Sequence, residues 1–197
     1  MPGDIKMIAV TKGLSAIKIR AAFDCGIRDF GENRVQEAAS KIAELADLKQ
    51  ITWHMIGHVQ SNKARLATGL FDIIHSVDSV KLARLLNKQA QETLPILIQV
   101  NISEETTKNG FEVEQVASAV EEISRLPNVK VMGLMTIAPL VDDPEDVRPV
   151  FRKLREMRDS LGLEHLSMGM TDDFEVAIEE GATMLRIGRA IFHNRRG

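Results

Sequence analysis

The sequence predicts an α/β protein, a single-domain (β/α)8 barrel of the TIM type. Short apolar runs alternate with amphipathic segments along the whole of residues 1–197, and there are eight such runs. Strand–helix alternation implies parallel strands joined by right-handed crossovers. Eight units favour closure into a barrel, although 197 residues is short for that fold. An open doubly wound sheet is the alternative, but it usually carries about five or six strands.

Each strand is expected where a short apolar run ends in a turn signal or a polar residue. The first run, residues 5–11, is apolar and partly β-branched and is closed by Gly13, which is typical of a strand buried on both faces. Residues 95–102 form the clearest buried strand. The other strands are expected at 28–31, 52–57, 71–75, 129–135, 165–168 and 184–187.

The segments between these strands have the apolar spacing of helices, with positions recurring every three or four residues. Ser61 and either Asp78 or Ser79 are the expected N-caps of two of them. Helices are expected at about 15–25, 35–45, 61–68, 79–91, 113–123, 147–161 and 172–180.

Charge and cysteine content exclude several classes of protein. The net charge is −3, and acidic and basic residues are interspersed, so neither nucleic acid nor a membrane surface is an expected partner. The single cysteine, Cys25, excludes an intrachain disulfide and fits a reducing compartment. No apolar run approaches the length of a membrane span. We therefore expect a cytoplasmic protein.

The functional positions of a barrel are the carboxyl ends of its strands. Lys12 ends the first strand, where an amine could form an imine; the alternative is a rim lysine that points into water. Closure makes the last strand the neighbour of the first, so Lys12 and Arg186 belong to one corner. Loops after strands seven and eight commonly bind phosphate, and here they contain Gly169, Thr171 and Gly188. This combination favours a phosphorylated carbonyl compound bound as an imine.

Two observations argue against a phosphate ligand at this corner. A buried guanidinium at Arg186 needs a partner, and an ion pair with a carboxylate would satisfy it without any ligand. Asp172 and Asp173 follow Thr171 in a helix's first turn, where they would repel a phosphate unless they point away.

The histidines are not expected to bind a metal ion. His54 and His58 would have the spacing of two ligands only in a helix, whereas residues 52–57 are expected to form a strand. His75 and His165 are expected to be core or rim residues.

Six sequence blocks at the expected strand ends form a recognisable set. They are AVTK (9–12), FGENRVQE (30–37), WHMIGHVQSNK (53–63), IHSVDS (74–79), LSMGMT (166–171) and RIGRAIF (186–192). Together they resemble the signature of the pyridoxal phosphate homeostasis protein family, in the right order and over nearly the whole chain. That family is similar to the barrel domain of alanine racemase. The resemblance therefore implies an alanine racemase N-terminal-domain-like fold and pyridoxal 5′-phosphate (PLP) as the cofactor.

The resemblance also implies a role for individual residues. Lys12 matches the lysine that forms the Schiff base, and Arg186 matches the arginine that faces the pyridine nitrogen. The implied phosphate contacts come from Ser167, Thr171 and the backbone around Gly188 and Arg189. The residues implied to line the pocket are Asn33, His54, Ser76 and Met135.

The sequence departs from the family pattern in two places. Most members carry a helical leader before the first strand, whereas here Ile5 begins it almost at once, so we expect the packing at the barrel bottom to differ. The family usually has glycine where this chain has His193, and we expect little effect on binding.

The sequence favours a binding protein over an enzyme. Alanine racemase chemistry uses a tyrosine from a second domain of a partner chain, and this chain has no tyrosine. An arginine at the pyridine nitrogen keeps that nitrogen unprotonated and weakens the ring as an electron sink. We therefore expect a PLP homeostasis protein that holds PLP reversibly on Lys12 without appreciable amino-acid turnover.

The expected partners are PLP and the apo forms of PLP-dependent enzymes, and the expected state is a monomer. One alternative is a weak PLP-dependent racemase, with Lys12 as one base and a histidine or water as the other. Another is an aldolase-type barrel that uses its lysine to bind a sugar phosphate.

Overall fold

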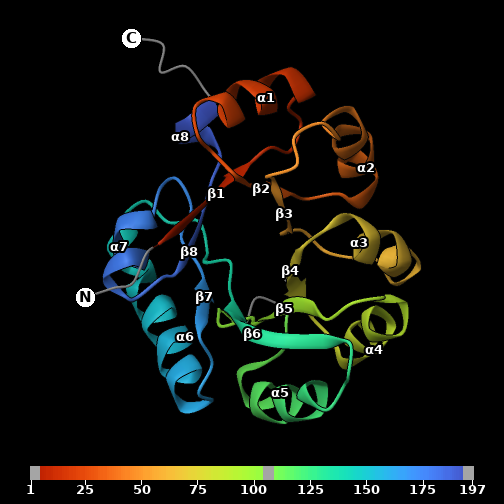
Figure 1. Ribbon diagram of the computed structural model, residues 1–197. Helices are drawn as coiled ribbons and strands as arrows, with labels where there is room; N and C mark the ends of the chain where they lie inside the picture. Colours follow the sequence, from red (N-terminus) through yellow and green to blue (C-terminus); the bar gives the residue numbers. More distant parts are fainter. Residues whose placement is uncertain (1–4, 104–108, 193–197) are drawn as a thin grey trace.

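Eight parallel strands form a closed barrel with helices around it (Figure 1), in a computed structural model that describes residues 5–103 and 109–192. His193 therefore lies outside the described residues. The strands pair in sequence order, and β8 closes on β1. They are β1 (Lys6–Val10), β2 (Asp29–Glu32), β3 (Thr52–Met55), β4 (Ile73–Val77), β5 (Leu94–Gln99), β6 (Val129–Met135), β7 (His165–Ser167) and β8 (Met184–Ile187). The predicted barrel is confirmed.

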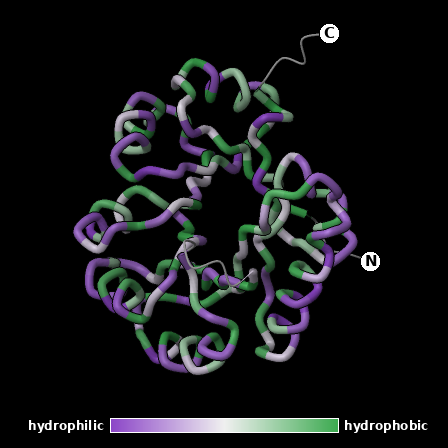
Figure 2. Tube along the Cα trace, turned by 180° about the vertical axis from the view of Figure 1, so that it is seen from behind, coloured by the Kyte–Doolittle hydropathy of each residue, from purple (hydrophilic) through white to green (hydrophobic). Residues whose placement is uncertain are grey.

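The helices lie between successive strands, on the outside of the barrel (Figure 1). Figure 2 shows hydrophilic and hydrophobic stretches alternating along them, as expected of helices with one face toward a core. The α-helices are α1 (Ala16–Asp24), α2 (Val35–Glu44), α3 (Ala64–Leu70), α4 (Val80–Gln89), α5 (Val116–Ser124), α6 (Arg148–Ser160), α7 (Phe174–Glu179) and α8 (Arg189–Phe192). Short 3-10 turns precede three of them: η1 (Ser61–Lys63), η2 (Val113–Gln115) and η3 (Pro144–Val147).

Several predicted boundaries and caps differ from those observed. The prediction that Ser61 caps a helix is wrong, because Ser61 begins η1 and its side chain caps nothing. Ser79 caps α4, with its hydroxyl accepting from the Leu82 N–H at 3.2 Å. Asp78 pairs instead with His58. Strand β4 runs two residues further than predicted, and α7 begins at Phe174 rather than at residue 172.

Most of the hydrophobic core lies between the sheet and the helices. Phe30 of β2 and Trp53 of β3 stack outside the barrel with ring centroids 5.8 Å apart. The interior of a (β/α)8 barrel is normally filled by branched apolar side chains. Here a small separate cluster of Ile8, Leu97, Met135 and Met184 fills part of the interior. Met132 packs against this cluster, and the barrel also holds the buried polar side chains of His54, His75, Ser167 and Arg186.

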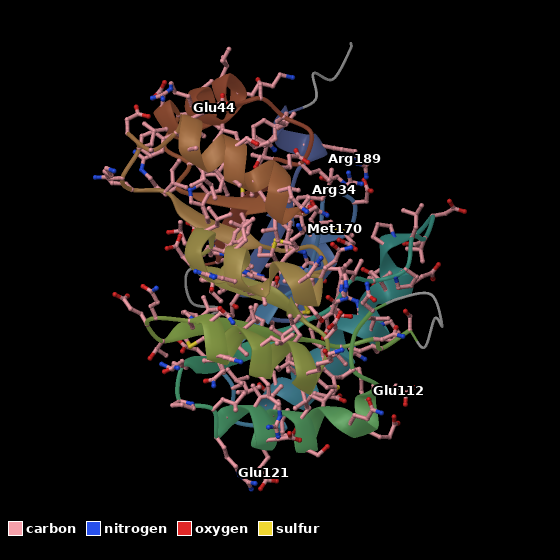
Figure 3. The ribbon with its side chains drawn as sticks, turned by 90° about the vertical axis from the view of Figure 1, so that its right-hand side faces the viewer. Arg34, Glu44, Glu112, Glu121, Met170 and Arg189 are labelled. Atoms are coloured by element: carbon pink, nitrogen blue, oxygen red, sulfur yellow. The ribbon has the colours of Figure 1, made fainter. Side chains whose placement is uncertain are left out.

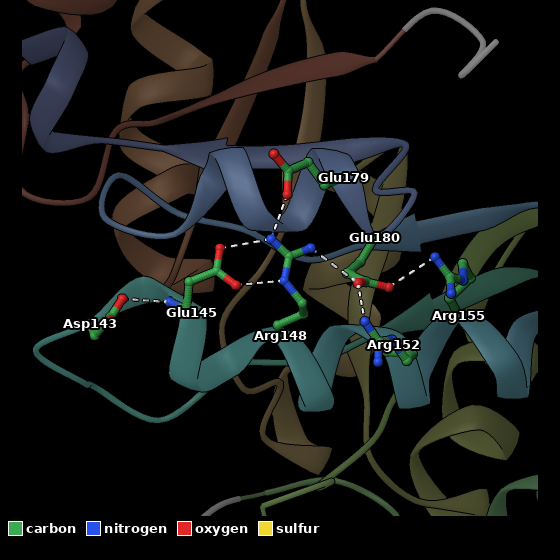
Figure 4. Close-up of polar contacts among 7 residues, drawn as sticks. All are labelled: Asp143, Glu145, Arg148, Arg152, Arg155, Glu179 and Glu180. Atoms are coloured by element: carbon green, nitrogen blue, oxygen red, sulfur yellow. Dashed lines mark hydrogen bonds and ion pairs between the residues drawn. The ribbon is translucent and has the colours of Figure 1, made fainter.

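An ionic cluster joins α6 to α7 (Figure 4). Arg148 contacts Glu145, Glu179 and Glu180, and Arg152 and Arg155 also reach Glu180. Burial raises the pKa of Glu180, but its arginine partners outweigh this and leave that pKa below the usual value. Exposed pairs contribute little individually, but a network around one buried carboxylate holds two helices together. The cluster thus supports the segment that carries β7 and β8.

Within the described ranges, no helix has both the length and the apolar character needed to cross a membrane.

Candidate functional site

Lys12 lies two residues beyond the end of β1, at the carboxyl end of the barrel, and is exposed. Ala9 of β1 pairs with Ile187 of β8, and a Cβ built on Gly188 would lie 3.4 Å from the Val10 Cβ. The ends of β1 and β8 are therefore in contact, which places Lys12 and Gly188 at one corner. Figure 3 shows Arg189 at this same end of the barrel, with Glu44, at the far end of α2, toward the opposite side.

The residue before Lys12 is held by a buried ion pair. The Lys41 ammonium donates to the Thr11 carbonyl at 2.7 Å and to Glu32 Oε1 at 2.8 Å. The Thr11 hydroxyl donates to the same Glu32 oxygen at 2.5 Å. The Glu32 side chain is fully buried and the Lys41 side chain is 8% exposed. Burial raises the pKa of Glu32, although Lys41 and Thr11 oppose that rise.

The residue after Lys12 is held by the same group of side chains. The Gly13 N–H donates to Glu37 Oε1 at 2.6 Å, and that oxygen also accepts from Lys41 at 2.6 Å. The hydrogen bond from Lys41 lowers the pKa of Glu37. Both backbone neighbours of Lys12 are therefore anchored to α2, while the amine itself stays accessible.

Arg186 lies inside the barrel below this corner, paired across the sheet with Ile8. It donates to Ser167 Oγ at 2.7 Å and to the Thr136 carbonyl at 2.8 Å. Burial lowers its pKa to about 10, and the nearby Asp173 charge opposes that shift. The contacts seen for Arg186 are to neutral oxygens, so the alternative of a direct ion pair with a carboxylate does not account for its burial.

The two aspartates after Thr171 are bound to groups of the loops that follow β7 and β8. Asp172 pairs with Arg189, and Asp173 accepts the Met170 N–H at 2.5 Å. Burial raises the pKa of Asp173. Each carboxylate is therefore paired with a donor, and the Met170 N–H and the Arg189 side chain are already used by these contacts.

Three more of the predicted pocket residues, Ser167, Met135 and Ser76, lie at or next to the ends of β7, β6 and β4. Ser167 is fully buried, and its hydroxyl contacts Arg186 and His75. Met135 lies in the interior apolar cluster. The Ser76 hydroxyl donates to the Gly57 carbonyl at 2.6 Å.

Asn33 lies at the carboxyl end of β2, beside a basic pocket. Its Oδ1 is buried and, among the described atoms, has no hydrogen-bond partner. A Cβ on Gly57 would lie 2.3 Å from the Asn33 carbonyl oxygen, so glycine is required for this close approach. Asn33 also lines a pocket of ≈ 420 Å³ together with Arg34, His58 and Lys63. The positive charges of Arg34 and Lys63 would favour an anionic group in this pocket.

Sequence reasoning missed a polar chain in the interior. His54 Nε2 lies 2.9 Å from Asp29 Oδ1, and His54 Nδ1 lies 2.9 Å from His75 Nε2. His75 Nδ1 lies 2.9 Å from Ser167 Oγ, which joins this chain to Arg186. The available signal in the sequence was that Asp29, His54 and His75 are polar residues within short predicted strands. Across the described residues, no three histidine, cysteine or acidic side chains gather in a way that could hold a metal ion.

The stability of the protein should depend on pH through His75. Burial keeps its pKa well below 6.5, and the positive charge of Arg186 lowers it further. An unfolded histidine has a pKa of about 6.5, so below that pH the unfolded chain binds a proton that the folded protein does not. The free energy of unfolding should therefore fall as the pH falls, with about 1 kcal/mol from this residue between about pH 7.5 and 5.5.

Urea unfolding at these two pH values checks this expectation against His75→Gln. The variant should lose less stability on acidification than the wild type. The same loss in both proteins would mean that His75 takes up its proton while folded.

The sequence and the fold match known proteins over nearly the whole chain. The alanine racemase N-terminal domain family matches residues 2–195. The chain is 47% identical over 200 residues to the pyridoxal phosphate homeostasis protein of Aquifex aeolicus, covering 97% of this chain and 87% of that protein. It is 44% identical over 199 residues to the pyridoxal phosphate homeostasis protein of Pseudomonas aeruginosa, with coverages of 98% and 86%.

Solved structures agree with these relatives. PipY of Synechococcus elongatus with PLP bound is 40% identical, with a TM-score of 0.91, over 98% of this chain and 94% of that chain. Alanine racemase of Corynebacterium glutamicum shares the fold alone, at 17% identity and a TM-score of 0.74 over 97% of this chain and 56% of that chain. The chain therefore belongs to the alanine racemase N-terminal domain family and, within it, to the pyridoxal phosphate homeostasis proteins.

Proposed function

We propose that this protein binds PLP at the carboxyl end of its barrel and serves PLP homeostasis in the cytoplasm. It holds PLP as a reversible Schiff base on Lys12. The observation that carries this proposal is the corner itself, where an exposed lysine on an anchored backbone adjoins Gly188 and lies above the buried Arg186. A solved relative of 40% identity binds PLP, which supports the same ligand here.

The residues at this corner fit the chemical groups of PLP. Arg186 supplies N–H donors for the ring nitrogen, which accepts hydrogen bonds when unprotonated. Thr171 and the backbone around Gly188 and Arg189 supply donors for the phosphate. The buried Asn33 Oδ1 without a partner is an acceptor that a ligand or lysine N–H could use. Bound PLP supplies an aldehyde with which an amine forms an imine.

The surroundings of the lysine favour holding PLP over turning over amino acids. A two-base racemase needs a second positioned acid or base, and the sequence has no tyrosine. His54 and His75 are fully buried and hydrogen-bonded within the interior chain, and His58 is paired with Asp78 at 2.8 Å. None of these three is a free base beside Lys12, which favours a binding protein over a racemase that uses one of them as its second base.

A titration with PLP, followed by absorbance and borohydride reduction, tests the proposal. Wild type should develop an imine band, and peptide mapping should place the reduced pyridoxyl group on Lys12. Lys12→Ala should lose both, whereas Lys18→Ala, at an exposed position of α1, should keep both. An adduct spread over surface lysines, or its persistence in Lys12→Ala, would refute the Lys12 anchor.

Two further measurements address partners and turnover. We propose that the protein is a monomer that passes PLP to apo PLP-dependent enzymes. Light scattering should report the mass of one chain, and loaded protein should activate an apoenzyme faster than the same amount of free PLP. Sustained racemisation of alanine or serine by the loaded protein would contradict the assignment as a binding protein.

A further inference from the structure

A continuous chain of hydrogen bonds crosses the barrel interior and ends on Arg186. Its contacts come from five strands and measure 2.9 Å (Asp29–His54), 2.9 Å (His54–His75), 2.9 Å (His75–Ser167) and 2.7 Å (Ser167–Arg186). At the other end Asp29 also accepts from Lys6, at 2.9 Å. His54, His75 and Ser167 are fully buried, so water does not substitute for these contacts.

The donor direction along this chain follows from its two ends. The guanidinium of Arg186 only donates, and the carboxylate of Asp29 only accepts. With both histidines neutral, one arrangement satisfies each contact. Arg186 donates to Ser167, the Ser167 hydroxyl donates to His75 Nδ1, His75 Nε2–H donates to His54 Nδ1, and His54 Nε2–H donates to Asp29. Both histidines therefore carry their proton on Nε2.

The other arrangement requires an extra proton. If His75 carried its proton on Nδ1, His54 would have to donate from both nitrogens and become an imidazolium beside Asp29. The interior already holds the Arg186 cation, and a second buried cation close to it is costly. Burial disfavours the Asp29 anion, but hydrogen bonds from His54 and Lys6 outweigh this and leave its pKa below the usual value. Asp29 is therefore an anion even when His54 is neutral.

This arrangement has a consequence for Arg186. A carboxylate placed directly on a guanidinium fixes its position but cancels much of its charge. Here the fixed contacts of Arg186 are the neutral Ser167 hydroxyl and the Thr136 carbonyl, and the Asp29 anion lies three side chains away along the chain. Arg186 is thus held in place by neutral groups. The charge of Asp173 still acts on it, but none of the contacts seen for Arg186 is a direct ion pair, so its remaining N–H groups can donate to a ligand.

We propose that Asp29, His54, His75 and Ser167 form a positioning relay that holds Arg186 as a charged hydrogen-bond donor toward the ring nitrogen of bound PLP. The inference rests on the proposed function, because it assigns a role at that same site. Among the four relay residues, His75 is the critical link, since it joins the two halves of the relay and touches neither Lys12 nor the loop at Gly188 in any contact seen here.

The first test needs no ligand. Ring-nitrogen NMR of the 15N-labelled protein near pH 7.5 should show His54 and His75 both neutral and both protonated at Nε2. A His75 protonated at Nδ1, or an imidazolium at His54, would overturn the relay whether or not the protein binds PLP.

The second test measures how substitutions of His75 change PLP binding, with the imine absorbance as the readout. His75→Leu interrupts the relay, and His75→Gln keeps one donor and one acceptor in a neutral side chain. The Leu variant should bind PLP about tenfold more weakly, as expected when the hydrogen bond from the Arg186 guanidinium to the ring nitrogen is lost, and its imine band should shift. The Gln variant should recover part of both. His165→Asn, a histidine of β7 outside the relay, should match wild type.

The outcomes separate the two proposals. No imine on Lys12 in wild type would refute the proposed function, and the NMR result alone would then decide the relay. Normal affinity and an unchanged band in a folded His75→Leu protein would overturn the positioning role while leaving Lys12 as the anchor. Circular dichroism establishes that each variant is folded.

Discussion

Replacing Lys41 with methionine is expected to lower the free energy of unfolding by about 3–5 kcal/mol, because it leaves the buried Glu32 without its cation. The Thr11 carbonyl and Glu37 lose a donor in the same step. Urea unfolding near pH 8 measures the change. The loss should be smaller near pH 5, since burial already raises the pKa of Glu32 and a proton can then replace the missing charge.

An exposed ion pair provides the matched control for this variant. Arg20 pairs with Asp47 through two contacts on the surface, and Arg20→Met should lower the free energy of unfolding far less than Lys41→Met does, because water solvates the charge that is left. The double variant Lys41→Met/Glu32→Gln should be more stable than Lys41→Met alone, because it removes the uncompensated charge. A Lys41→Met protein as stable as Arg20→Met would show that Glu32 is not held as a buried carboxylate.

The same substitution should also weaken PLP binding. Lys41 and Glu37 hold the backbone on both sides of Lys12, so their loss frees the segment that presents the amine. The imine titration, carried out on protein that is folded at low temperature, should show a higher dissociation constant than wild type. An unchanged constant would limit the role of this group to stability.

Replacing Gly133 with alanine should lower the free energy of unfolding by at least about 3 kcal/mol, which is at the upper end of the usual cost of overpacking a core. A Cβ at this position would lie 2.0 Å from the His165 carbonyl oxygen and 2.6 Å from its carbon, both in the backbone of β7. Gly133 pairs with His165 in the sheet, so neither strand can yield without breaking the β6–β7 ladder. Urea unfolding and the PLP titration should both report the loss, since β7 carries Ser167.

Gly69→Ala is the control for that substitution. Gly69 lies in α3 with no atom within 4 Å of a built Cβ, so alanine should stabilise the protein by about 0.4–1 kcal/mol. Equal stability of the two alanine variants would mean that β6 and β7 are not in close contact at residue 133.

The order and type of the elements could be predicted from the sequence because they depend on local patterns. The apolar run before Lys12 and the helical spacing between strands are set within windows of about ten residues. Caps were less predictable: Ser61 and Ser79 look alike as N-cap candidates, but only the Ser79 side chain meets a helix N–H. Which of them caps depends on the turn that precedes the helix.

The sequence by itself determined the barrel, and with it the corner of Lys12, Arg186 and Gly188, because closure of eight parallel strands makes the last the neighbour of the first. Only the tertiary structure decided what supports that corner. The Lys41–Glu32 pair joins a helix to a strand, and the chain from Asp29 to Arg186 spans residues far apart in sequence. Such contacts depend on the register of distant strands and on which face of the sheet each side chain takes. The apolar pattern of the sequence shows that a polar residue lies in a buried strand and so needs a partner, but it does not show which residue is that partner.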